Sequence, residues 1–175
     1  MSDKLLLDAI HFACLKHSTQ RRKDGAETPY INHPIGVAHI LMFEGNVTDI
    51  DIVIAAILHD TIEDTDTSVD EIISRFGQRI ANIVLEVTDD KNLPKAERKL
   101  KQIESAPKKS NEAKQVKIAD KIYNLRDINR VRPVGWSLER CQEYFDWGHK
   151  VLNGCKGVNE QLDLIASRLT FTNKS

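Results

Sequence analysis

The stretch Asp51-Ile-Val-Ile-Ala-Ala-Ile-Leu-His-Asp-Thr-Ile-Glu-Asp64 decides how this chain folds. Its first part, 52–58, is apolar on every side when wound as a helix, which is typical of a helix buried all round. The run then ends in one imidazole and three carboxylates, those of His59, Asp60, Glu63 and Asp64. Because unpaired buried charge is costly, these groups need a neutralising partner. The pattern predicts a central helix that ends at a cation site.

We expect this helix to continue through the acidic cluster to Asp64, so that His59 shares one face with Glu63, and Asp60 shares another with Asp64, at i,i+4 spacing. Thr48 together with Asp51 resembles a capping box that would open this helix.

Helix signals continue in both directions from this stretch. Pro34 suits the first turn of a helix that runs to Glu44. Ser68 and Glu71 form a capping box before a short helix that stops at Gly77. Ser110 caps a long helix to about Val131. No alternating strand and no internal repeat is evident. We therefore predict an all-α fold, a single-domain helical bundle of about eight helices spanning 1–175, with its core at about 5–169.

Composition excludes several classes of protein. The chain has 175 residues, 41% of them hydrophobic, and a net charge of −1. Such a nearly neutral chain is no bulk nucleic-acid binder, and no apolar run approaches membrane-spanning length. The N-terminus lacks the pattern of a signal peptide. The cysteines Cys14, Cys141 and Cys155 are scattered, which favours reduced thiols and a cytoplasmic protein.

Further ligands for a cation must come from other segments. His33 precedes Pro34, after a loop of about a dozen residues. Asp120 interrupts an otherwise apolar helix face, so its carboxylate needs a partner. Ligation by histidine and carboxylate without sulfur suits manganese or iron better than a structural zinc site. Such an ion lowers the pKa of bound water and polarises a phosphoryl oxygen. Glu63 and Asp64 would then orient or deprotonate the attacking water.

These residues resemble a known family. The order His33 … His59-Asp60 … Asp120 is similar to the H…HD…D signature of the HD superfamily of metal-dependent phosphohydrolases. More narrowly, Arg22-Lys23-Asp24-Gly25 with Pro29-Tyr-Ile-Asn-His-Pro34, then 59–64, then Ala119-Asp-Lys-Ile-Tyr-Asn-Leu-Arg126 resemble the hydrolase domain of the Rel/Spo alarmone enzymes. The resemblance covers nearly the whole chain, whose length is similar to that of the hydrolase-only members, the small alarmone hydrolases found also in metazoa.

The resemblance implies hydrolysis of guanosine 3′,5′-bis(diphosphate) and its pentaphosphate, (p)ppGpp, to GDP or GTP and pyrophosphate. It implies one Mn²⁺ per chain, held by His33, His59, Asp60 and Asp120. Glu63 and Asp64 match the family's catalytic acidic pair. Arg22 and Lys23 match residues near the guanine base, and Asn124 matches a residue at the sugar.

An anionic substrate also needs basic partners beside so many acids. We expect Lys117 and Lys121, at i,i+4 beside Asp120, to bind phosphate, and Arg22 to stack on the base. We expect the run 95–101 to face solvent. Aromatic residues near the C-terminus are expected to serve packing and not base stacking; these are Trp136, Tyr144, Phe145 and Trp147.

Two alternatives keep the pocket but change its use. The first is an HD phosphatase or nucleotidase that acts on another nucleotide, such as one with a ribose 2′- or 3′-phosphate like NADPH. The second is a non-catalytic nucleotide sensor. The acidic pair Glu63 and Asp64 speaks against a sensor, because a pure binder of polyphosphate gains nothing from extra acids. The expected partner is a small-molecule nucleotide, with no nucleic acid and no membrane.

Overall fold

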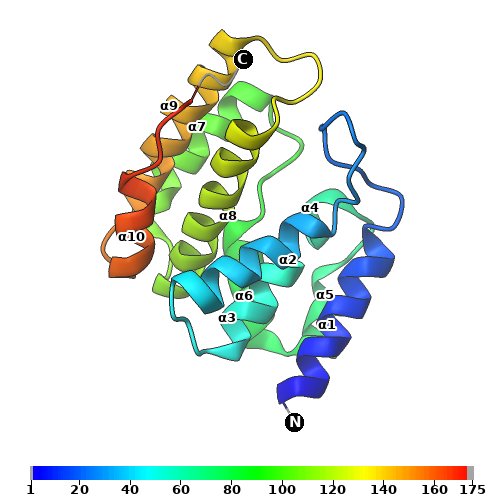
Figure 1. Cartoon of the computed structure of the whole chain (residues 1–175). Helices are drawn as coiled ribbons and strands as arrows, with labels where there is room; N and C mark the ends of the chain where they lie inside the picture. The colour runs from blue at the N-terminus through cyan, green and yellow to red at the C-terminus, as the bar shows by residue number, and fades with distance from the viewer. Residues whose placement is uncertain (1, 173–175) are drawn as a thin grey trace.

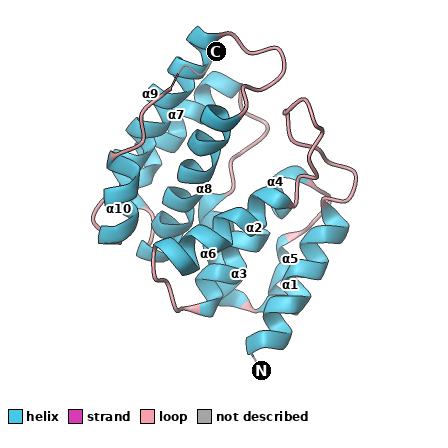
Figure 2. Ribbon diagram, in the orientation of Figure 1, coloured by secondary structure: helices cyan, strands magenta, loops and turns pink. Residues whose placement is uncertain are grey.

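The computed structural model describes residues 2–172, and helices dominate it (Figures 1 and 2). In chain order the elements are α1 (Ser2–Lys16), α2 (Asn32–His39), the π-helix η1 (Ile40–Glu44), α3 (Ile50–Leu58), α4 (Thr61–Asp64), α5 (Val69–Phe76), α6 (Gln78–Val87), α7 (Lys95–Ser105), the 3₁₀ helix η2 (Ala106–Lys108), α8 (Asn111–Arg130), α9 (Leu138–Cys155) and α10 (Glu160–Ser167). Within the described residues there is no strand, only an isolated antiparallel bridge between Arg21 and Pro29. The prediction of an all-α fold is confirmed.

Helix α3 forms the centre of the molecule. Every residue from Ile52 to Leu58 is at most 4% exposed. The helices α1, α2, α6 and α8 all pack against it. Other helices therefore surround α3, and none of its faces contacts solvent, as its composition predicts.

The prediction that this helix continues through Asp64 is wrong, because α3 ends at Leu58. His59 and Asp60 lie in the turn before α4. Side-chain bonds to the last carbonyls stabilise this turn: Thr61 Oγ1 donates to Leu58 O at 2.7 Å, and His59 Nδ1 lies 2.7 Å from Ala56 O. These bonds satisfy carbonyls that a helix end leaves free.

The prediction that Thr48 caps the beginning of α3 is also wrong. Asp49 is the N-cap, and its carboxylate accepts the backbone N–H of Asp51 at 3.1 Å. The caps at Ser68 and Ser110 are confirmed, since each hydroxyl accepts an N–H three residues later.

Helix α8 runs beside α2 and α3 (Figure 1). Lys117, Asp120, Lys121 and Asn124 lie on one face of α8, at spacings of three and four residues. Gly36 of α2 makes a close approach possible, since a Cβ there would lie 2.0 Å from Tyr123 Cε2 of α8.

The basic loop between α1 and α2 folds back on itself as a small hairpin. The backbone N–H of Arg22 donates to Thr28 O at 2.8 Å, and that of Tyr30 donates to Gln20 O at 3.1 Å. The loop is joined to the α8–α9 connection, where Val134 N–H donates to Lys23 O at 2.8 Å. In the described part of the chain, no helix combines the length and apolarity that a membrane span requires.

Candidate metal centre and nucleotide cavity

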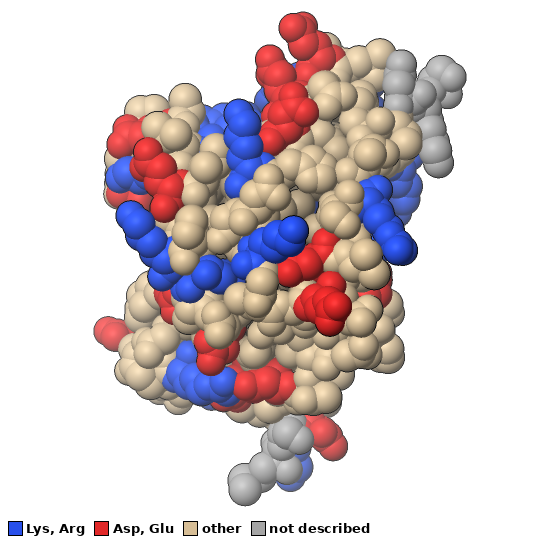
Figure 3. Space-filling view, turned by 90° about the vertical axis from the view of Figure 1, so that its left-hand side faces the viewer, with Lys and Arg blue, Asp and Glu red and all other residues tan. Residues whose placement is uncertain are grey.

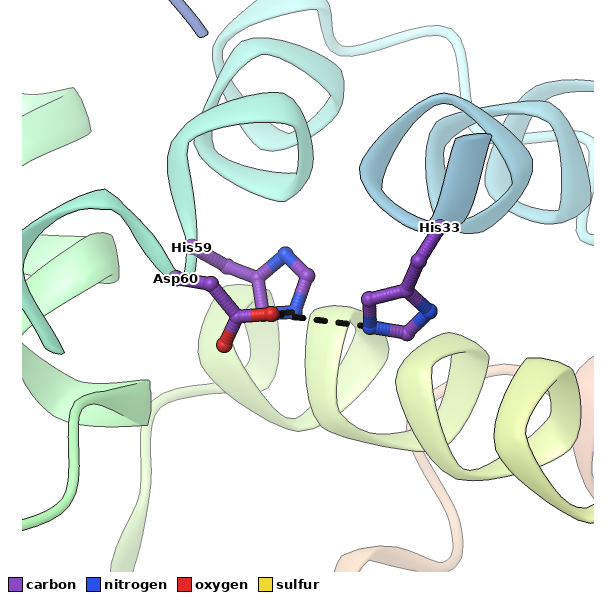
Figure 4. Close-up of side chains that lie close together, drawn as sticks. All are labelled: His33, His59 and Asp60. Atoms are coloured by element: carbon purple, nitrogen blue, oxygen red, sulfur yellow. Dashed lines mark ion pairs between the residues drawn. The ribbon is translucent and has the colours of Figure 1, made fainter. Parts of the chain in front are cut away.

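Three of the predicted ligands meet where α2 and α3 face α8. His33 comes from α2, and His59 with Asp60 comes from the turn after α3 (Figure 4). One ligand atom from each lies within 4.8 Å of the others. Asp60 Oδ2 lies 2.9 Å from His59 Nε2 and 3.6 Å from His33 Nε2.

The fourth predicted ligand, Asp120, reaches the same place from α8. Its Oδ1 lies 3.3 Å from His33 Nε2 and 4.0 Å from His59 Nε2. Two neighbours on its own helix hold the carboxylate: Lys121 Nζ donates to Oδ2 at 2.9 Å, and Asn124 Nδ2 donates to Oδ1 at 2.6 Å. The four side chains named from the sequence are therefore brought together from two helices, α2 and α8, and from the turn after α3.

The hydrogen-bonding pattern of His59 fits metal ligation. Its Nδ1 donates to Ala56 O, so that nitrogen keeps its proton whether the ring is neutral or charged. Its Nε2 is buried and lies 2.9 Å from the carboxylate of Asp60, so either a proton or a cation can be held between them. A histidine ligand commonly has this arrangement, with one nitrogen on a backbone carbonyl and the other free for the ion. With two imidazoles and two carboxylates, the donor set suits a divalent cation.

The pKa shifts of the clustered side chains show that the carboxylates favour a positive charge beside them. Burial lowers the pKa of His59, but the carboxylates of Asp60 and Asp120 outweigh burial and raise that pKa to about 9. Burial likewise works against the ionised carboxyl of Asp120, yet Lys121 and His33 hold its pKa well below the usual range. A proton on an imidazole thus takes the place that a cation would fill.

The acidic pair Glu63 and Asp64 lies in α4, next to this cluster, and the two acids have different surroundings. Glu63 Oε2 accepts the backbone N–H of Asp89 at 2.9 Å, and burial raises the pKa of Glu63 to about 7. Asp64 forms an ion pair with Lys91. One acid therefore exchanges protons near neutral pH, and the other has a cationic partner.

A cavity of about 250 Å³ opens over the ligands, and we call it the metal-side cavity. Both acids and all four ligands line it, together with Tyr30, Val87, Asp89, Lys95, Arg98, Lys99, Gln102, Lys117, Lys121, Asn124, Tyr144 and Trp147. Lys117 and Lys121 are at most 6% exposed and already paired, Lys117 Nζ with Val87 O at 3.2 Å and Lys121 with Asp120. They form the wall behind the ligands.

The expectation that 95–101 faces solvent is wrong for Arg98 and Lys99, which are half-buried. Both line the metal-side cavity together with Lys95, which is exposed as predicted, and Arg98 Nη1 lies 3.8 Å from Glu63 Oε1. The spacing i, i+3, i+4 of these residues on α7 is the signal that could have shown one basic face. Lys101, on the opposite side, is exposed and paired with Glu97.

A second cavity of about 220 Å³ adjoins the first, and we call it the loop-side cavity. Tyr30, Asn124 and Tyr144 line both cavities. Arg22 and Lys23 line the loop-side cavity, where Arg22 donates to Asp127 Oδ2 at 2.8 Å and to Asn124 Oδ1 at 3.0 Å.

The aromatic residues near the C-terminus pack as predicted, and three of them also line a cavity. Trp136, Tyr144 and Trp147 pack against the hydrophobic core, and each lines a cavity as well. Phe145 is 1% exposed and is a packing residue, as predicted. Helical spacing alone did not distinguish the aromatic side chains that face a cavity from the one that faces the core.

Charge is spread unevenly over a chain that is nearly neutral. On the face shown in Figure 3, Lys and Arg side chains gather in a band across the middle, with acidic groups above and below. Local gathering of this kind attracts an anionic ligand without a high net charge.

With these four side chains on one cavity wall, the class of protein follows. The chain belongs to the HD domain family, whose sequence model matches residues 9–140. Within that family it is a homologue of the proteins named guanosine-3′,5′-bis(diphosphate) 3′-pyrophosphohydrolase MESH1. The relative from Danio rerio is 56% identical over 162 residues, which is 93% of this chain and 90% of the relative. The relative from Homo sapiens is 58% identical over 158 residues, 90% and 88% of the two chains.

A solved structure agrees with this assignment. It is described as "a metazoan ortholog of SpoT" that "hydrolyzes ppGpp and plays a role in starvation responses", and it superposes with a TM-score of 0.92. The two sequences are 45% identical, with 94% of this chain and 93% of that chain covered. The resemblance to the Rel/Spo alarmone hydrolases, predicted from three motifs, is confirmed.

Proposed function

We propose that this protein is a divalent-metal-dependent 3′-pyrophosphohydrolase of guanosine 3′,5′-bis(diphosphate) and its pentaphosphate, with one Mn²⁺ per chain. The observation that carries the proposal is the metal-side cavity, where four metal-binding side chains and two further acids share one wall. The names of the relatives support the substrate, because the similarity covers about nine-tenths of both chains.

The metal ligands in this proposal are His33, His59, Asp60 and Asp120. A bound divalent ion supplies Lewis acidity toward a phosphoryl oxygen and lowers the pKa of water. Manganese is favoured over magnesium because two of the four ligands are imidazoles.

Glu63 is proposed as the general base. Its pKa of about 7 suits removal of a proton from water near neutral pH, and the backbone N–H of Asp89 fixes one of its oxygens. Asp64, paired with Lys91, is proposed to position the water and the neighbouring acid. In the reaction the water oxygen bonds to phosphorus, the bond from phosphorus to the ribose 3′ oxygen breaks, and that oxygen takes up a proton.

The remaining cavity residues are proposed to bind the nucleotide. Arg22 and Lys23 lie on the loop-side cavity, where a purine can stack on a guanidinium plane. Lys117 and Lys121 are proposed to supply positive charge behind the phosphates, since both line the metal-side cavity. Asn124 lies between the two cavities, which is a suitable place for the sugar.

Turnover by Glu63→Gln and Asp64→Asn variants tests this assignment. Purified protein with Mn²⁺ should release pyrophosphate from guanosine bis(diphosphate), and EDTA should abolish the release. Glu63→Gln should lower kcat on the order of 10²- to 10⁴-fold, because a positioned base is lost while nucleotide binding is retained. Asp66→Asn is the matched control, because this carboxylate lies two residues after Asp64 in the chain but its side chain is 87% exposed.

The same assay distinguishes the alternatives. Faster turnover of NADPH than of the guanosine substrate would assign the pocket to another phosphorylated ribonucleotide. Tight nucleotide binding with no turnover of either compound, even with metal loaded, would assign it to a sensor.

A further inference from the structure

Tyr30 connects the loop-side cavity to the candidate metal centre. It follows the bridge residue Pro29 at the end of the basic loop, and its backbone N–H is held by Gln20 O at 3.1 Å. Its side chain points into the site, where its hydroxyl lies 2.6 Å from Asp60 Oδ2. Tyr30 lies three residues before His33 in the same motif, but it is neither a proposed metal ligand nor a proposed nucleotide contact.

The ring of Tyr30 is fixed from several sides. It packs against the ring of His17 at 5.0 Å and the ring of His33 at 5.7 Å between centroids. The guanidinium of Arg22 lies over it at 5.7 Å. His17 is 2% exposed, so the tyrosine has little freedom on that side. A ring held in this way carries its hydroxyl to one place.

The hydroxyl acts as a donor to the carboxylate. A carboxylate oxygen can only accept, so in this 2.6 Å contact the phenol O–H of Tyr30 donates to Asp60 Oδ2. The same carboxylate oxygen lies 2.9 Å from His59 Nε2 and 3.6 Å from His33 Nε2. A hydrogen bond from Tyr30 therefore fixes the orientation of the oxygen that both imidazoles face.

We propose that Tyr30 is a positioning residue for the metal centre, and that its hydroxyl holds the Asp60 carboxylate in the orientation that binds the ion. The inference rests on the proposed metal site, but it does not depend on the identity of the nucleotide. Groups that orient metal ligands contribute to affinity although they do not touch the ion.

Tyr30→Phe tests the inference because it removes the hydroxyl and keeps the ring. Tyr123→Phe is the matched control. The ring of Tyr123 also packs on His33, at 4.9 Å, and Arg22 lies 5.7 Å from it, but it makes no contact with Asp60. Affinity for Mn²⁺ is measured in the absence of nucleotide, by competition with a chromogenic chelator. Tyr30→Phe should weaken binding about 10- to 100-fold, and Tyr123→Phe should leave it within about twofold of the wild type.

A second readout reports on geometry and not on stability. Co²⁺ bound in place of Mn²⁺ should show a changed visible absorption spectrum in Tyr30→Phe and an unchanged one in Tyr123→Phe. Equal Mn²⁺ affinity and equal Co²⁺ spectra in Tyr30→Phe and the wild type would overturn the inference, whatever the activity of either protein. Absence of turnover by the metal-loaded wild type would instead count against the proposed function, and it would leave this inference standing.

A measurement on the wild-type chain keeps the test decisive if Tyr30→Phe fails to fold. The chain has three tyrosines, so labelling only the ζ carbon of each ring gives one NMR signal per tyrosine. Binding of diamagnetic Zn²⁺ should shift the signal of Tyr30 more than those of Tyr123 and Tyr144, which single Phe variants of the latter two assign. An unmoved Tyr30 signal on saturation with Zn²⁺ would contradict the role.

Discussion

Because of His59 and Glu63, we expect the stability of the metal-free protein to fall as pH rises. Glu63 has a pKa raised from 4.5 to about 7, so its neutral form is favoured in the folded state. His59 has a pKa raised from 6.5 to about 9, so its charged form is favoured. For both groups the stabilising contribution is complete below the unfolded pKa and is lost as pH rises through the folded one.

We therefore expect the melting temperature of the EDTA-treated protein to fall as pH rises, first between about 4.5 and 7 and then between about 6.5 and 9. Differential scanning calorimetry across this range measures the effect. His59→Gln should remove the upper part of the fall and keep the lower part. A melting temperature that stays level from pH 6.5 to 9 would contradict the raised pKa of His59.

At the same scale, the sequence predicts some site residues better than others. His59, Asp60 and Asp120 could be named because each is a polar group in or next to an apolar helical run, where such a group needs a partner. His33 could be named from its place in the H…HD…D order of the family that the sequence resembles. Tyr30 and Arg98 could not be named in this way. Both side chains suit a wet surface equally well, and only the packing of the helices brings them to the cavities.

At the scale of elements, α2 and α8 pack closely at Gly36. A methyl group on Gly36 would lie 2.0 Å from the ring of Tyr123, and that ring packs on His33. We expect Gly36→Ala to lower the free energy of unfolding by about 1–3 kcal/mol, since the ring must move to relieve the clash.

Urea unfolding of the metal-free protein measures this loss, and Gly25→Ala is the control. Gly25 lies in the basic loop with no atom within 4 Å of an added Cβ, so its replacement should be nearly neutral. Metal affinity should fall in Gly36→Ala as well, because His33 is displaced with the tyrosine ring. Equal stability of the two alanine variants would mean that α2 and α8 can separate without cost.

Helix starts could be predicted more accurately than the end of α3. Ser68 and Ser110 act as caps because their own side chains accept the N–H groups of the first turn, a local effect. The end of α3 depends on Thr61 and His59, which bond to carbonyls behind them and turn the chain at Asp60. A helical pattern contains no sign of such a turn, so the interruption between α3 and α4 was missed.

At the scale of the whole molecule, the ion would join helices from distant parts of the chain. Its ligands lie on α2, after α3 and on α8, so binding to the folded state should stabilise the entire bundle. At free Mn²⁺ about 100 times the Kd, the expected gain is about 2.7 kcal/mol. Melting temperature should rise with added Mn²⁺ and return to the metal-free value with EDTA.

Asp120→Asn provides the control for this stabilisation. The amide keeps the size of the side chain but removes a negative ligand, so Mn²⁺ should no longer raise the melting temperature. Asp127→Asn, on the same helix but outside the ligand cluster, should keep the metal-dependent gain. A full Mn²⁺ effect in Asp120→Asn would remove this residue from the ligand set.

Helix α8 has a geometric consequence for the nucleotide. Asp120 lies at the ion site and Asp127 anchors Arg22, and both project from one uninterrupted helix of 20 residues. Seven residues along an α-helix span about 10 Å. This distance between Asp120 and Asp127 stays the same when the loops move. A molecule that contacts both the ion site and Arg22 must therefore have a matching distance between its reacting phosphate and its base.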